Sequence, residues 1–250
     1  MTQAVYPSLA GKTVVVTGGG SGIGESVVEG FVRQKSRVFF LDIADGESQA
    51  LVARLGGAAQ YIKCDLTDIA ALKAAIAQVE AKAGPISVLV NNAANDDRHK
   101  FEDVTPEYWD QRIAVNLKHM FFGAQSVAAG MKRGGGGVII NLGSVSWHLA
   151  LPSLPIYETA KAGIEGLSRS LARDLGEANI RVNTVVPGAI RTPRQMKLWH
   201  TPEEEAKILA QQCIKARVDP VHVTAMILFL ASDDASMCTA HSYWVDAGYC

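Results

Sequence analysis

Seven short runs of apolar residues, rich in valine and isoleucine, recur along this chain with helix-like stretches between them. The runs cover residues 12–17, 37–42, 59–65, 86–92, 137–144, 180–188 and 242–248. Apolar residues stand at consecutive positions in most runs, so strands formed there bury both of their faces. Between the runs, as in 160–175, apolar residues recur every three or four positions, which is typical of amphipathic helices. This alternation indicates a parallel sheet that helices cover on each side.

We therefore predict an α/β fold of the Rossmann type: a doubly wound, seven-stranded parallel sheet with helices on both faces. Right-handed crossovers in such a sheet bring the loops that follow the strands to one edge, where ligands bind. The chain has 250 residues, 48% of them hydrophobic, which suffices for one sizeable core. We expect residues 1–250 to form a single domain.

The charges of the chain are balanced. It has 24 basic and 25 acidic residues, a formal net charge of −1, and no basic block. We therefore expect neither a nucleic-acid partner nor a membrane partner.

The first residues show no cationic start followed by an apolar stretch, so we expect no secretory signal. The four cysteines, Cys64, Cys213, Cys238 and Cys250, form no Cys-x-x-Cys pair, which favours reduced thiols in a cytoplasmic protein.

The histidines show no spacing that is typical of metal ligands, and we expect no metal site. His119, His222 and His241 are expected to satisfy local hydrogen bonds instead.

A glycine-rich turn, TGGGSGIG at residues 17–24, directly follows the first predicted strand and opens a helix. Gly18 permits a tight turn, while Gly22 and Gly24 allow a close approach of the backbone to a pyrophosphate and close packing of the helix. Unpaired amides at the helix start then face the phosphates. In this context the turn predicts a dinucleotide site, in which Ser21 and Ile23 also contact the cofactor.

Asp42 ends the second predicted strand, where a carboxylate can accept hydrogen bonds from both hydroxyls of the adenosine ribose. Its charge would repel a 2′-phosphate, so NAD is favoured over NADP. Lys35 and Arg37 are near in sequence, and this leaves NADP open as a secondary cofactor.

Tyr157 and Lys161 are four residues apart within a predicted helix, so their side chains project from the same face. The spacing brings a phenol next to a cation, and a nearby positive charge favours loss of the phenol proton.

These features together resemble the short-chain dehydrogenase/reductase family over essentially the whole chain. The resemblance is carried by TGGGSGIG, by NNAA at 91–94, by Asn116, by Ser144 thirteen residues before Tyr157, by YETAK at 157–161 and by PGAIRT at 187–192. It implies that the single domain both binds a dinucleotide and catalyses, and that the protein assembles as a homotetramer through helices around 105–133 and 155–177.

The resemblance also implies roles for four catalytic residues. Tyr157 would be the general base, and Ser144 would hydrogen-bond the substrate oxygen. Asn116 would bind, through its backbone and side chain, a water that links Lys161 to solvent. A free phenol titrates near ~10, so action near neutral pH requires a pKa lowered by about three units. The charge of Lys161 and the positive nicotinamide ring would supply that effect.

Further cofactor contacts follow from the same resemblance. Asp65 and Leu66 would flank the adenine, Asn92 and Ala93 would lie against the nearer ribose, and Val115 would lie close by. The carboxamide of the nicotinamide would be held by a set of residues after the sixth strand, namely Pro187, Gly188, Ile190 and Thr192. Tyr157 and Lys161 would contact the cofactor as well.

The loops after the fourth, fifth and sixth strands combine hydrogen-bonding groups with flat aromatic surfaces. A polyhydroxylated ring suits this mixture, whereas a steroid or an acyl chain calls for a more continuous apolar tunnel. The predicted substrate residues are Asn95, Ser144, Ser146, His148, Tyr157, Gln195 and Trp199, with Asn95 and His148 as the leading individual candidates. Asp96 and His99 are further hydrogen-bonding groups of these loops.

At closer range, NDDRHKF, SWHL, YETAKAGIEG and ASDDASMCTAHSYWVDAG resemble bacterial sugar dehydrogenases that act on pentoses. This implies NAD-dependent oxidation of an aldopyranose, such as L-arabinose or D-xylose, at C1 to the lactone. The choice of sugar and epimer stays open.

Two alternatives also stay open: an NAD(P)-dependent reductase of a carbonyl substrate such as a 3-oxoacyl thioester, and a dinucleotide sensor without catalysis. A helix near 201–213 is expected over the substrate pocket as a candidate lid.

Overall fold

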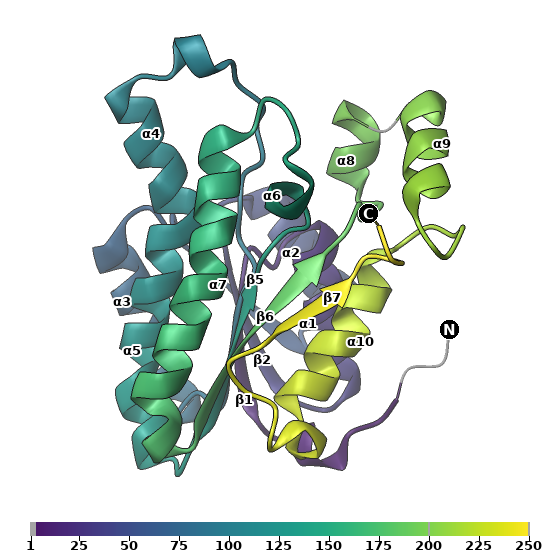
Figure 1. The fold of residues 1–250 in the computed structure, drawn as a ribbon. Coiled ribbons are helices and arrows are strands. Elements are labelled where there is room, and N and C mark those ends of the chain that lie inside the picture. The colour runs from purple at the N-terminus through teal and green to yellow at the C-terminus, as the bar shows by residue number, and fades with distance from the viewer. Residues whose placement is uncertain (1–3, 200, 250) are drawn as a thin grey trace.

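The computed structural model describes residues 4–199 and 201–249 and contains one sheet of seven parallel strands in the order β3-β2-β1-β4-β5-β6-β7 (Figure 1). The strands are β1 (Thr13–Thr17), β2 (Arg37–Asp42), β3 (Ala59–Lys63), β4 (Val88–Asn91), β5 (Gly137–Leu142), β6 (Ile180–Pro187) and β7 (Ser242–Val245). Each lies within one of the seven apolar runs. The predicted doubly wound α/β fold is confirmed.

Alternating side chains of the strands feed two separate hydrophobic clusters. In β1, Val14 and Val16 belong to one cluster and Val15 to the other, and all three are fully buried. Successive side chains of a strand point to opposite faces, so a run of consecutive valines fills both layers of the core.

Helices cover both faces of this sheet (Figure 1). On one side, α1 (Gly22–Arg33) packs against α10 (Pro220–Ala231), with α2 (Asp45–Arg54) near β3. On the other side lie α3 (Ile69–Ala83), α5 (His119–Arg133) and α7 (Pro155–Leu175). Three short helices also occur near the loops that follow strands: α4 (Pro106–Ile113), α6 (Ser146–Leu149) and α8 (Pro193–Leu198).

The carboxyl ends of β6 and β7 point toward α8 and α9 (Pro202–Gln211), which stand above the sheet edge (Figure 1). Each of these two helices begins with proline after a threonine whose hydroxyl accepts from the backbone: Thr192 for α8 and Thr201 for α9. The helix expected near 201–213 is therefore present as α9.

Between α4 and α5 the chain forms a π-helix, Ala114–Lys118. Such wider turns are rare and are frequently found at functional sites. This one contains Asn116 and Val115, and it places Asn116 fully buried next to the sheet edge.

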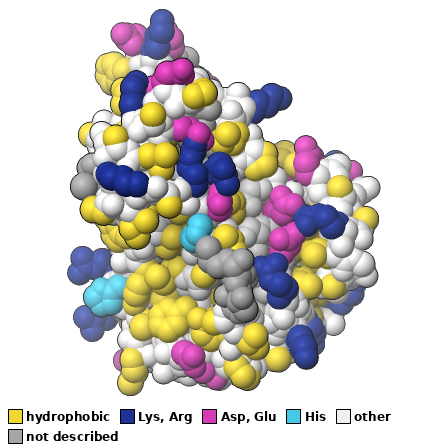
Figure 2. Space-filling view, turned by 90° about the vertical axis from the view of Figure 1, so that its right-hand side faces the viewer, with side chains coloured by type: hydrophobic (Ala, Val, Ile, Leu, Met, Phe, Trp, Pro, Cys, Tyr) yellow, Lys and Arg dark blue, Asp and Glu magenta, His cyan; other side chains and the backbone are white. Residues whose placement is uncertain are grey.

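Figure 2 shows one face of the molecule, on which acidic and basic side chains are interspersed and hydrophobic side chains gather in one region. None of the described helices has the length and apolar character needed to cross a bilayer. Cys64, Cys213 and Cys238 are free thiols, and Cys250 lies outside the described residues.

Candidate active site

A cavity of about 720 Å³ opens at the carboxyl end of the sheet. Loops after β1, β4, β5 and β6 line it together with α7, α8 and α9. This volume lies in the range that small-molecule and cofactor sites occupy. The edge predicted from the topology is therefore where the cavity lies.

The glycine-rich turn lines the cavity through Gly18, Ser21, Gly22 and Ile23. Gly18 and Gly22 have φ values of +65° and +59°, a left-handed conformation that glycine adopts without strain. A Cβ on Gly24 would lie 1.8 Å from the Gly18 carbonyl oxygen, so α1 can start this close to the turn only with glycine at that position. This cradle at a helix start fits the pyrophosphate of a dinucleotide.

Asp42 ties the glycine-rich turn to the loop after β2. Its Oδ2 accepts from the Gly20 amide at 2.8 Å and its Oδ1 from the Ala44 amide at 2.9 Å. A carboxylate has about four acceptor sites, so it can also take ribose hydroxyls. Ala44 and Glu47 line the adjacent cavity wall, and Glu47 adds a second negative charge there.

Lys35 and Arg37, the two cations that kept NADP possible as a cofactor, lie at the amino end of β2, away from Asp42. Arg37 begins the strand and Asp42 ends it, so about 17 Å of extended chain separates them at roughly 3.3 Å per residue. The Arg37 side chain donates to the Gly11 carbonyl, and Lys35 precedes Arg37 at that same end. Neither residue can read a phosphate beside Asp42.

The loop after β4 is fastened to the glycine-rich turn. Asn92 Nδ2 donates to the carbonyls of Thr17 and Gly18 at 3.0 and 2.9 Å, and the Ala93 amide donates to the Thr17 hydroxyl at 3.2 Å. Both Asn92 and Ala93 line the cavity. The cavity lining also contains all four residues expected near the nicotinamide: Pro187, Gly188, Ile190 and Thr192.

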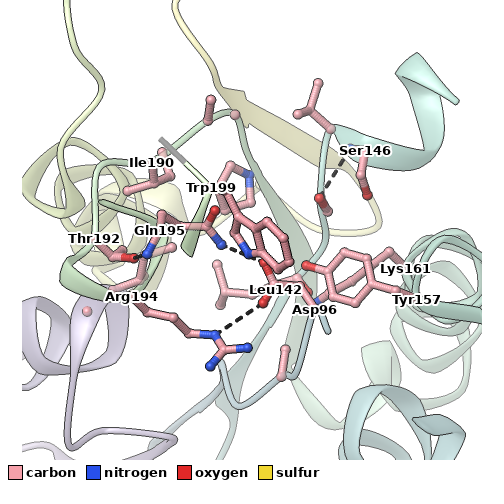
Figure 3. Close-up of a pocket in the computed structure, with 18 of the residues that line it drawn as sticks. Asp96, Leu142, Ser146, Tyr157, Lys161, Ile190, Thr192, Arg194, Gln195 and Trp199 are labelled. Atoms are coloured by element: carbon pink, nitrogen blue, oxygen red, sulfur yellow. Dashed lines mark hydrogen bonds and ion pairs between the residues drawn. The ribbon is translucent and has the colours of Figure 1, made fainter. Parts of the chain in front are cut away.

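Tyr157 and Lys161 lie together in the same cavity (Figure 3). Ser144 lines this cavity as well. Tyr157 lies in the first turn of α7, and the Lys161 ammonium is 5.4 Å from the centre of the Tyr157 ring. Lys161 is 1% exposed, and its Nζ donates to the Leu142 carbonyl at the end of β5 at 2.7 Å. The helix spacing thus places a phenol beside a buried cation, as predicted.

The protonation of this cluster depends on burial. Burial and the nearby Asp96 carboxylate raise the pKa of Tyr157 above the usual value of tyrosine, while a hydrogen bond with Ser144 lowers it. Burial lowers the pKa of Lys161 to about 7, and Asp96 opposes that effect. A further positive charge next to Tyr157 would favour the phenolate.

Asn116 makes two hydrogen bonds with the backbone of the loop after β4. Its Oδ1 accepts from the Asn95 amide at 2.8 Å and its Nδ2 donates to the Asn95 carbonyl at 3.0 Å. The side chain therefore fixes the loop after β4 to the π-helix. Each of these atoms keeps one further hydrogen-bonding position, so the water that Asn116 would bind beside Lys161 stays a prediction.

Among the predicted substrate residues, Ser144, Ser146, Tyr157, Gln195 and Trp199 line the cavity. Asn95 does not, because its backbone is held by Asn116 and its side-chain oxygen accepts from the Asp97 amide. These contacts engage the backbone and the side-chain oxygen of Asn95 within the loop. The structure therefore does not support the prediction that Asn95 contacts the substrate.

The structure also does not support the prediction that His148 contacts the substrate. Its Nε2 lies 2.9 Å from a Glu165 carboxylate oxygen, and its ring lies between Trp147 and Trp244, with centroid distances of 3.6 and 4.2 Å. It belongs to an aromatic cluster outside the cavity wall.

Five expected cofactor residues do not line the cavity either: Gly24, Asp42, Asp65, Leu66 and Val115. Asp65 Oδ1 accepts from the amide and hydroxyl of Thr67, Leu66 is 7% exposed, and Val115 lies within the π-helix. Asp65 and Leu66 follow β3, the neighbour of β2, so they lie beyond Asp42 along the same sheet edge.

Comparison with known proteins agrees with this geometry. A family model described as Enoyl-(Acyl carrier protein) reductase matches residues 18–250. The chain is 59% identical to a D-xylose 1-dehydrogenase of Caulobacter vibrioides over 252 residues, covering 100% of both chains. It is 47% identical to a Rhizobium meliloti protein named "Probable galactose dehydrogenase GalD", covering 99% and 98% of the two chains. A solved short-chain type dehydrogenase/reductase from Mycobacterium ulcerans superposes with a TM-score of 0.92 at 27% identity, covering 97% and 90%.

The chain belongs to the short-chain dehydrogenase/reductase family.

In this dehydrogenase, several cavity residues were missed as site residues by the sequence analysis. Asp96 was noted only as a polar loop residue, while Arg98 and Arg194 were not considered. Arg194 Nε lies 3.3 Å from Asp96 Oδ1, and the Arg98 guanidinium lies 4.6 Å from the centre of the Trp199 ring. The sequence signal that could have identified Arg194 is its position two residues after Thr192, in the segment that follows β6.

His119 of this enzyme is another departure from expectation. It is fully buried, and neither ring nitrogen has a partner in normal hydrogen-bond geometry among the described residues. Burial and the Lys161 charge lower its pKa to about 4, with the Ala114 carbonyl acting in the opposite direction. The imidazole is therefore neutral near pH 7. His222, in contrast, accepts from the Asp219 amide at the start of α10, as expected.

Proposed function

We propose that this dehydrogenase oxidises an aldopyranose, in particular a pentose such as D-xylose or L-arabinose, at C1 to the lactone with NAD. The observation that carries the proposal is the meeting of Tyr157, Ser144 and Lys161 in a cavity whose remaining polar groups suit a polyol. The names of the two relatives, a xylose and a galactose dehydrogenase, support a sugar substrate.

The proposed chemistry follows from these groups. Tyr157 accepts the proton of the C1 hydroxyl, and the Ser144 hydroxyl donates a hydrogen bond to the same oxygen and positions it. The Lys161 charge favours the phenolate. Pro187, Gly188, Ile190 and Thr192 would hold the nicotinamide ring of an oxidised cofactor, which would accept the hydride that leaves C1. Loss of that proton and that hydride turns C1–OH into the lactone carbonyl.

The experiment that tests the proposal is a panel of aldoses with NAD, scored by NADH formation. D-Xylose, L-arabinose, D-galactose and L-fucose are included, together with a 3-oxoacyl thioester and NADPH. We expect turnover of at least one pentose, with kcat/KM at least about tenfold above that for any non-sugar. Reduction of the thioester with no oxidation of any aldose would contradict the proposal and indicate the reductase. Binding of NAD without any turnover would indicate the sensor.

We propose NAD as the preferred cofactor because Asp42 and Glu47 bring two negative charges to the place where a 2′-phosphate would lie. Asp42→Asn removes one of them with little change in shape. We expect the ratio of kcat/KM for NAD to that for NADP to fall by roughly 10- to 100-fold, because the repulsion and one acceptor are lost together. Initial rates with both cofactors measure this ratio.

The matched control is Asp45→Asn, which removes an exposed carboxylate from the first turn of α2, outside the cavity. Its cofactor ratio is expected to stay within about twofold of the wild-type value. A wild-type enzyme that prefers NADP would refute the assignment of Asp42.

Homotetramer assembly and a cytoplasmic location stay predictions. Exposed aromatic side chains are available for assembly, since Trp109 on α4, Phe121 on α5 and Trp244 on β7 are each more than 40% exposed. Burial of such surfaces between subunits is a common reason for their exposure in a single chain.

A further inference from the structure

We propose that Asp96 is a specificity-determining residue of the sugar site and accepts a hydrogen bond from the hydroxyl on C2, next to the reacting C1. This inference rests on the proposed function and assigns one part of its substrate site.

The position of Asp96 brings its carboxylate next to the reacting groups. It follows β4 in the loop after Asn95 and lines the cavity, with its side chain 23% exposed. In the close-up it lies beside Tyr157 and below Trp199 (Figure 3). Its negative charge acts on both Tyr157 and Lys161. At each group it contributes an upward change in pKa, which adds to the effect of burial at Tyr157 and opposes it at Lys161.

The carboxylate is held in place but retains accepting capacity. Arg194 Nε lies 3.3 Å from Oδ1, and Gln195 Nε2 donates to Oδ2 at 2.5 Å. Both partners come from the first turn of α8, whose start is fixed by Thr192. A carboxylate offers about four acceptor sites, so two stay available for hydroxyl groups.

Attachment of the loop to α8 does not depend on Asp96 alone, because Asp97 also contacts Arg194. Asp97 Oδ1 accepts from Arg194 Nη2, and its Oδ2 lies 3.3 Å from Arg112 Nη1 on α4. Asp97 is 45% exposed and does not line the cavity. An anion beside Tyr157 opposes formation of the phenolate, and hydroxyl donors from a substrate would offset that repulsion.

The chemistry of a pyranose decides which neighbour of C1 faces Asp96. One neighbour is the ring oxygen, which has lone pairs and no proton and is repelled by a carboxylate. The other is C2, whose hydroxyl can donate. Asp96 therefore orients the ring with its C2 side toward the loop after β4.

Two further polar groups in the wall suit the remaining hydroxyls. Ser146 is 4% exposed, and its hydroxyl has no hydrogen-bond partner among the described residues; the same holds for the Trp199 indole N–H. Unpaired polar groups that are buried beside a cavity cost free energy unless a ligand pairs with them.

The test combines a residue change with a substrate change. kcat/KM is measured for D-xylose and for 2-deoxy-D-xylose on the wild-type enzyme and on Asp96→Asn, each at its own pH optimum. We expect Asp96→Asn to lose roughly 10- to 100-fold with D-xylose and less than about threefold with the 2-deoxy sugar, because the hydroxyl it serves is absent there. Equal losses with both sugars, or no loss with either, would overturn the inference alone.

The matched control is Asp97→Asn, which weakens the same Arg194 contact from outside the cavity. Any loss it causes is expected to be equal for the two sugars, and a loss confined to D-xylose would overturn the inference. If Asp96→Asn does not fold, Asp96→Glu retains the charge beside Arg194 and displaces it by one methylene. It must then show the same preferential loss with D-xylose. Failure of the wild-type enzyme to oxidise any aldose would overturn the proposed function and this inference with it.

Discussion

Replacement of Tyr157 by phenylalanine is expected to lower kcat for sugar oxidation by about 10³-fold or more and to leave the affinity for NAD within about threefold. The change removes only the oxygen that accepts the substrate proton, and general-base catalysis contributes up to about 10⁴-fold. The ring still fills its place between Ser144 and Lys161. Steady-state rates with D-xylose measure the loss, and titration calorimetry measures NAD binding.

A matched control for this change is Tyr108→Phe on α4. The Tyr108 hydroxyl lies 3.4 Å from a ring nitrogen of His99, outside the cavity wall. Its activity should stay within about twofold of wild type. Near-full activity of Tyr157→Phe would refute the assigned base.

Lys161→Met is expected to lower kcat by about 10²-fold or more while it raises the free energy of unfolding at pH 7. The activity falls because the phenolate loses its neighbouring charge. The stability rises because the wild-type protein buries an ammonium whose hydrogen-bond partner among the described residues is the Leu142 carbonyl. Methionine fills a similar volume without a charge. We expect the free energy of unfolding of Lys161→Met at pH 7 to exceed that of the wild type by about 2 to 4 kcal/mol. The difference corresponds to the lowered pKa of the buried lysine, whose cost the variant no longer carries.

The pH dependence of this gain has a definite sign. The pKa of Lys161 falls to about 7 in the folded protein, whereas in the unfolded chain it keeps its ordinary value near 10.5. Between these values the unfolded chain binds more protons, so the wild-type contribution to stability rises with pH. The advantage of the methionine variant should therefore shrink from pH 7 toward pH 9. Urea unfolding of both proteins at these pH values measures it, and a difference that does not change with pH would contradict the buried, perturbed ammonium.

The fold and the reacting groups were predictable because local rules determine them. Consecutive valines in β1 require a strand buried on both faces, and four-residue spacing on a helix brings Tyr157 and Lys161 together. Gly18 and Gly22 could be assigned because only glycine adopts a left-handed turn without strain. These features depend on a few neighbouring residues, so the sequence carries them.

The substrate wall was less predictable, because closeness in sequence does not tell where a loop side chain points. Asn95 and Asp96 are adjacent, yet Asn116 captures Asn95 while Asp96 faces the cavity. His148 is two residues from Ser146, and its ring is taken by Trp147, Trp244 and Glu165 instead. These outcomes are decided by partners that are distant in sequence, such as Glu165 and Asn116.

Trp199 provides this enzyme with a built-in optical probe. It is one of four tryptophans in the chain, and of the four it alone lines the cavity, while Trp109 and Trp244 are each 42% exposed at the surface. Its indole lies under the Arg98 guanidinium, so a sugar or nicotinamide entering the cavity alters the polarity around an emitting ring. Occupancy can thus be followed by intrinsic fluorescence without labels, in active and inactive variants alike.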